Sequence, residues 1–291
     1  MNSDGEFMDC CDTPNRSTRR GNVDGTGIRE NPVSDAVIRI LGLPLTPAHS
    51  LRYAETLVEP RLRRRPRTPF LVSFANPLAV KLIQSDRTYR SNLERMDLVF
   101  CDGIALTWAA RWIGRYPMAR ISFDSTSIGP AVFEVAQRND RTIALVGGRP
   151  GVAAAAADRI RNHFPQLRIV AAIDGYRSAD QIVSAVIGVD PDIVVCGMGA
   201  PRQEALLTSL SDAGWHGTGF TCGGYLDQLV TCFDFYPVLI NRLDLRWLYR
   251  IGREPRRLGY RYIVEYAPFL RSLALELVHV YGSSHWRSRR S

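Results

Sequence analysis

Asp97-Leu98-Val99-Phe100-Cys101-Asp102-Gly103, residues 97–103, is the part of the chain from which the architecture can be worked out. Its apolar run, bounded by Asp and Gly, predicts a short strand buried on both faces. Gly103 frees the backbone to turn and leaves room for a substrate, and residues 104–113 then follow a helical apolar pattern. Asp102 is therefore expected at the carboxyl end of a strand, where open α/β sheets bind ligands. Two interpretations stay open: Asp102 is a general base, or it caps the next helix.

Outward from this stretch, apolar strands alternate with amphipathic helices. The expected strands are 70–75, 98–101, 142–146, 168–173, 193–196 and 218–221. The expected helices are 77–84, 104–112, 129–137, 151–163, 179–187 and 201–210. This alternation predicts an α/β, Rossmann-like fold, with a mostly parallel sheet and helices on both faces. Right-handed crossovers would bring the strand-end loops to one edge of the sheet.

Flanking segments set the expected domain organisation. Residues 1–33 are polar and without periodicity, which predicts a disordered tail. A short strand near residues 36–45 and a helix from Thr46 or Ser50 to about Val58 would open the α/β domain, 34–235. Arginines between residues 61 and 67 predict a solvated linker, with a membrane-facing role as the alternative. Residues 236–291 form a basic helical appendage in this interpretation.

Charge and cysteine usage narrow the class of protein. The net charge of +8 is concentrated near the C-terminus, where residues 237–291 hold eleven arginines and four acidic residues. Such a local basic field predicts an anionic partner, namely a membrane surface, a pyrophosphate or a nucleic acid, although no nucleic-acid motif is present. The six cysteines form no C-x-x-C pair and no metal-ligand spacing, so we expect a reduced, cytoplasmic protein without a metal. No apolar run is long enough to predict a bilayer span.

Four expected strand-end loops carry unusual residues. The first strand contains Ser73 and is followed by Asn76, which either caps a helix or contacts a ligand. The other three loops combine glycines with polar side chains, and together they predict one nucleotide or nucleotide-sugar crevice, with Asp102 as its best-placed base. Their candidate residues are Gly147, Gly148 and Arg149; Gly197, Gly199, Pro201, Gln203 and Glu204; and Gly223, Gly224 and Asp227.

Several of these segments also resemble a known family. In order and spacing, CDGIALTWAARWIG (101–114), FDSTS (123–127), ALVGGRPG (144–151), IDGY (173–176), PDIVVCGMGAPRQE (191–204), TCGGYLDQ (221–228) and LRWLYRIGREPRRLGYRY (245–262) are similar to the WecG/TagA/CpsF glycosyltransferases, glycosyltransferase family 26. The similarity covers roughly residues 37–271. This chain departs from the family pattern in its longer N-terminal tail and in carrying Ser73 near a position where Thr is common.

The resemblance implies an inverting, metal-independent enzyme that moves a sugar from a UDP-sugar to a polyprenyl-pyrophosphate-linked saccharide during surface-glycan or exopolysaccharide assembly. By resemblance, Asp102 is the base, Ser73 and Asn76 line the acceptor side, and the loops 147–151 and 197–204 hold UDP. The only D-x-D spacing, Asp190-Pro191-Asp192, precedes its strand and is expected to be a turn away from these loops. No cofactor is expected.

The basic appendage admits two interpretations. Its arginines recur at helical spacing, with Pro255 dividing them between two segments, and the candidates for pyrophosphate or lipid contact are Arg246, Arg250, Arg253 and Arg257. Aromatic and basic residues together favour a membrane interface over a solvent-facing stripe on the core. The resemblance implies that the appendage both docks on the inner membrane face and closes over the site, with a homo-oligomer hiding it in solution. The competing hypothesis is a non-catalytic nucleotide-binding regulatory or scaffold protein at the membrane.

Overall fold

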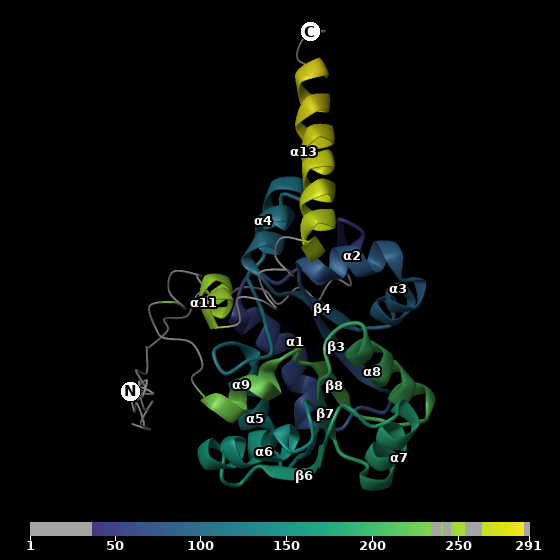
Figure 1. Cartoon of the computed structure of the whole chain (residues 1–291), viewed down its shortest axis with the longest axis vertical. Coiled ribbons are helices and arrows are strands. Elements are labelled where there is room, and N and C mark those ends of the chain that lie inside the picture. Colours follow the sequence, from purple (N-terminus) through teal and green to yellow (C-terminus); the bar gives the residue numbers. More distant parts are fainter. Residues whose placement is uncertain (1–36, 234–239, 241–245, 254–263, 288–291) are drawn as a thin grey trace, which may run out of the picture. The chain divides into compact units, whose positions relative to one another are not determined.

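The computed structural model describes residues 37–233, 240, 246–253 and 264–287 (Figure 1). Six strands form a parallel sheet in the order β4–β3–β8–β7–β5–β6. Their bounds are β3 (Phe70–Ala75), β4 (Leu98–Cys101), β5 (Thr142–Gly147), β6 (Arg168–Ile173), β7 (Ile193–Gly197) and β8 (Thr218–Thr221). The expected α/β fold is confirmed, and the expected strands match the observed ones to within one residue at each end.

Helices cover both faces of this sheet (Figure 1). The helices with described bounds are α1 (Leu51–Arg63), α2 (Pro77–Ser85), α3 (Arg87–Glu94), α4 (Ile104–Ile113), α5 (Ile128–Arg138), α6 (Val152–His163), α7 (Ala179–Val189), α8 (Arg202–Asp212), α9 (Tyr225–Thr231), α11 (Arg246–Arg253) and α13 (Ala267–Arg287). Side chains alternate between the two faces along each strand. In β3, Leu71 belongs to the core formed with buried residues of α2, α3 and α8. Val72 belongs to the core on the other face, formed with buried residues of α1 and α5.

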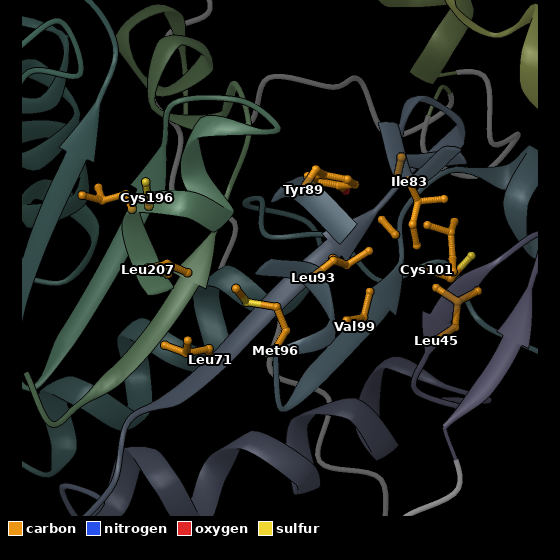
Figure 2. Close-up of a cluster of buried hydrophobic side chains, with 14 of the residues drawn as sticks. Leu45, Leu71, Ile83, Tyr89, Leu93, Met96, Val99, Cys101, Cys196 and Leu207 are labelled. Atoms are coloured by element: carbon orange, nitrogen blue, oxygen red, sulfur yellow. The ribbon is translucent and has the colours of Figure 1, made fainter. Parts of the chain in front are cut away.

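Figure 2 shows part of the first of these two cores, with Leu71, Tyr89, Leu93 and Leu207 among its members. Tyr89 and Leu93 lie one turn apart on α3, a helix that the sequence pattern does not indicate because its other residues are polar. Asp86 caps α3 by accepting a hydrogen bond from the Tyr89 backbone N–H. Burial of two large side chains on one face stabilises this short helix despite its polar composition.

The N-terminal part differs from expectation in two ways. Instead of one strand, β1 (Ile38–Ile40) and β2 (Leu43–Leu45) form an antiparallel hairpin whose turn places Leu41 and Gly42 at positive φ. Helix α1 begins after Ser50, as expected, but continues to Arg63. The first arginines of the predicted linker therefore belong to a helix, and the Arg61 guanidinium lies 4.9 Å from the centre of the Phe70 ring. The predicted tail, residues 1–33, lies outside the described residues.

Helix α13 contacts α2 and α4. Its Phe269 side chain is buried in the core beneath α2 and α4, and its Ser272 hydroxyl accepts a hydrogen bond from the Gln84 amide at 2.9 Å. These contacts attach the first turns of α13 to the α/β domain. Within the described ranges, no helix combines the length and apolar character that crossing a bilayer requires.

Candidate functional site

A cavity of about 670 Å³ opens at the carboxyl ends of the parallel strands. Loops after β3, β4, β5, β7 and β8 contribute to its wall, as the crossover rule predicts for right-handed α/β connections. The candidate residues that line this cavity are Asn76, Asp102, Gly103, Gly148, Arg149, Gly197, Gly199, Gln203, Gly223, Gly224 and Asp227. The structure thus brings together most of the residues singled out from the sequence.

Asp102 directly follows β4, and its backbone N–H donates to the Ala75 carbonyl at 2.7 Å. The capping position of α4 is held by Gly103, at φ +106°, so Asp102 does not occupy it. Burial raises the pKa of the neighbouring Cys101 thiol, the Asp102 carboxylate raises it further, and the Arg120 guanidinium lowers it. Asp102 and Arg120 both line the cavity.

Asn76 caps helix α2, one of its two interpretations from the sequence, while ligand contact stays a prediction. Its side-chain Oδ1 accepts a hydrogen bond from the Leu78 N–H at 2.9 Å, and Pro77 begins helix α2. Asn76 also lines the cavity. Capping fixes the rotamer of Asn76, so this side chain is held in place at the cavity wall.

The glycines of the crevice fall into two physical classes. A Cβ at Gly147 would lie 2.4 Å from the Gly197 carbonyl oxygen, and one at Gly148 would lie 2.3 Å from a Val152 methyl carbon. These positions require glycine for close packing between β5, β7 and α6. Gly199 has φ +74°, and a Cβ there would meet no described atom within 4 Å. Gly199 lines the cavity, and a side chain added there would not clash with the described protein.

Two candidates are buried beneath the wall instead of lining it. Ser73 and Glu204 are each 1% exposed, and the Ser73 hydroxyl donates to Glu204 Oε1 at 3.0 Å. The Gln203 amide donates to the same oxygen at 3.1 Å, and the Thr221 hydroxyl donates to Ser73 Oγ at 3.2 Å. Burial raises the pKa of Glu204, partly offset by the hydrogen bonds from Gln203 and Ser73.

The remaining candidates are placed as follows. Gly147 and Pro201 adjoin lining residues without lining the cavity themselves. Arg246, Arg250 and Arg253 belong to α11, and the description covers only their backbone. Arg257 lies outside the described residues.

Sequence reasoning missed several lining residues, among them Arg120, Asp124 and Tyr176, and it included Arg202 only as part of the loop 197–204. Asp124 accepts hydrogen bonds from the Ser122 and Thr126 hydroxyls at 2.6 and 2.7 Å, so its carboxylate is held rigidly. Arg202 donates to the Gly175 carbonyl at 2.5 Å and ties the loop after β6 to α8. The FDSTS and IDGY segments contain or adjoin most of these residues and were the available signal.

The D-x-D spacing is placed at the opposite edge of the sheet. Asp192 Oδ2 accepts hydrogen bonds from the Thr142 backbone N–H at 2.9 Å and from the Thr142 hydroxyl at 3.0 Å. Asp192 thus fastens the start of β7 to the start of β5, which confirms the prediction that this pair lies away from the loops. No cluster of three or more His, Cys, Asp or Glu side chains suited to a metal occurs in the described part of the chain.

Comparison with known proteins gives the following similarities. The model of the glycosyl transferase WecG/TagA/CpsF family matches residues 38–282. A UDP-Gal:alpha-D-GlcNAc-diphosphoundecaprenol beta-1,4-galactosyltransferase of Shigella boydii is 29% identical over 229 residues, which cover 77% of this chain and 94% of that protein. An extracellular ligand-binding receptor from Rhodopseudomonas palustris HaA2 aligns over 53% of this chain and 60% of that chain, with 16% identity and a TM-score of 0.28, too low to carry an argument.

Proposed function

Since the chain belongs to the WecG/TagA/CpsF glycosyltransferase family, we propose that it transfers a hexose from a UDP-sugar to a saccharide carried on polyprenyl diphosphate. The galactosyltransferase relative acts on a substrate of this kind, as its name states. The observation that carries the proposal is the position of Asp102, which shares one cavity with glycine-rich loops from three other strands. A base and an anion-binding surface are the two parts that this reaction needs.

In the proposed mechanism, Asp102 accepts the proton of the acceptor hydroxyl while that oxygen attacks the anomeric carbon of the donor. The bond between the anomeric carbon and the UDP oxygen breaks, and UDP leaves with the bonding electrons. A single displacement of this kind inverts the configuration at that carbon. Proton removal by a positioned base contributes roughly 10²- to 10⁴-fold to such a reaction.

The leaving UDP carries several negative charges, which the protein must stabilise. The loop Gly147–Gly151 leads into α6, and Arg149 lines the cavity beside Gly148. Backbone N–H groups at a helix start together with a guanidinium are suited to a diphosphate. We therefore assign UDP to the side formed by β5 and β7, and the acceptor to the side formed by Asn76 and Asp102.

An anionic membrane surface is the partner that a lipid-linked acceptor would require, and one exposed feature supports it. Trp108 and Trp112 stack on α4 with ring centres 5.9 Å apart, and they are 50% and 43% exposed. Residues 104–120 contain three arginines and no acidic residue. Tryptophan and arginine together suit the headgroup region of a bilayer. Trp108 also lines the cavity, so this surface adjoins the proposed site.

Transfer is tested with the purified full chain, a panel of radiolabelled UDP-sugars and synthetic polyprenyl-diphosphate-linked mono- and disaccharides. The proposal predicts a longer lipid-linked saccharide with at least one donor, released together with stoichiometric UDP. A protein that binds UDP but forms no product with any donor and acceptor pair would contradict it.

A further inference from the structure

Glu204 is a buried carboxyl group for which the proposed mechanism has no use. It is the third residue of α8 and is 1% exposed. Its Oε1 accepts from Ser73 on β3 and from the neighbouring Gln203, at 3.0 and 3.1 Å. Its Oε2 is buried and has no hydrogen-bond partner among the described residues. A buried carboxyl costs free energy that an apolar side chain would not, so capping of a helix start alone does not account for it.

The contacts of Gln203 show what this carboxyl can do. A glutamine amide presents an acceptor at one end and donors at the other, and its neighbours fix which end is which. Glu204 Oε1 accepts a hydrogen bond from the amide nitrogen of Gln203, so the Gln203 amide oxygen points the other way. That oxygen accepts the backbone N–H of Gly223 at 3.0 Å. Both Gln203 and Gly223 line the cavity, whereas Glu204 does not.

We propose that Glu204 is a positioning residue that fixes the orientation of the Gln203 amide and, through it, the Gly223 loop in the shape that binds the donor. The inference rests on the proposed function and extends its UDP side from the loops after β5 and β7 to the Gly223 loop after β8, the strand paired with β7. Ser73 on β3 donates to the carboxyl, and Thr221 on the paired strand β8 donates to Ser73. The network therefore joins the rigid sheet to two loops that connect strands and helices at the cavity.

The test measures UDP binding by calorimetry in the full chain, together with thermal unfolding and steady-state kinetics. Glu204→Leu removes the acceptor, and UDP should bind at least tenfold more weakly while the variant stays folded. Glu204→Asp keeps a carboxyl but withdraws it by one carbon, and should also weaken UDP binding. Glu204→Gln restores an acceptor at the same reach and should recover affinity to within about threefold of wild type. The donor KM should rise more than kcat falls.

Thr208→Val is the matched control. Thr208 is one turn further along α8, is also buried, and bonds to Asn92 and to its own helix, away from the cavity wall. It should leave UDP affinity unchanged.

A double-mutant cycle separates positioning from general stability. Gln203→Leu should weaken UDP binding by itself, and adding Glu204→Leu should cause little further loss, because both changes remove one chain of contacts. Additive losses, or wild-type affinity in Glu204→Leu and Glu204→Asp, would overturn the inference. Since UDP binding needs no acceptor, those results leave the proposed function intact, whereas a wild-type protein that does not bind UDP refutes the proposed function itself.

Discussion

Replacing Gly199 by alanine tests whether the glycine-rich wall is approached by a ligand. Gly199 has φ +74°, a conformation that costs an L-residue about 1–2 kcal/mol. An added Cβ would meet no described protein atom within 4 Å, so steric strain inside the protein adds nothing to that cost. If UDP lies against this backbone, the methyl group also displaces it. A tenfold loss of affinity corresponds to about 1.4 kcal/mol, and we expect a loss of at least that size.

Gly214 provides the matched control. It has φ +83°, an added Cβ would likewise meet no described atom within 4 Å, and it lies in the turn after α8, outside the cavity. Gly199→Ala and Gly214→Ala should therefore lose similar stability in urea titrations. Only Gly199→Ala should lose UDP affinity in calorimetry. Equal UDP affinity in both variants would refute the assignment of this wall to the donor.

Three further predictions follow from other parts of the structure. Asp192→Ala removes two hydrogen bonds to Thr142 and an ion pair with Arg141, so the free energy of unfolding should fall by about 2–4 kcal/mol. The UDP affinity of this variant should stay unchanged. A loss of UDP affinity in the folded variant would contradict a purely structural role for Asp192. Burial raises the pKa of Glu204, so the folded state holds that proton more tightly than the unfolded state does, and stability should decrease as pH rises from the ordinary glutamate pKa toward the raised one. In urea titrations across pH, Glu204→Gln should lack this decrease in stability. Tyr89, whose pKa is raised by burial and by Glu204, still titrates at high pH in both proteins. Parallel stability profiles for wild type and Glu204→Gln would disprove this prediction. Trp108→Ala with Trp112→Ala should reduce sedimentation with anionic vesicles, whereas Ile187→Ala with Val189→Ala, an exposed apolar pair on α7, should not; equal sedimentation of both variants would exclude the α4 surface.

The parallel sheet could be predicted from sequence because all its strands except the edge strand β6 are mostly buried, and each strand has a glycine, asparagine or aspartate at one end or both. Periodicity fails where packing overrides it. Helix α3 carries only Tyr89 and Leu93 on its buried face, and the hairpin turn at Leu41 and Gly42 needs positive φ at a leucine, which no turn rule anticipates. Such elements are stabilised by contacts with distant segments.

For the site, position relative to the strand ends was sufficient to bring most candidates into one cavity. Burial was not predictable: Ser73 and Glu204 were expected to line the crevice, yet they bond to each other across 131 positions beneath its wall. Arg120 was missed because its segment follows α4 and precedes α5, outside the strand-end loops. Long-range contacts of this kind have no local signature.

The central claim is that Asp102 accepts the acceptor proton, and Asp102→Asn tests it most directly. The amide keeps the size of the side chain but cannot take up the proton. Calorimetry with UDP and transfer to the lipid-linked acceptor should be measured on the same preparation. The account predicts wild-type UDP affinity with transfer reduced at least a hundredfold. Undiminished transfer by Asp102→Asn would contradict it.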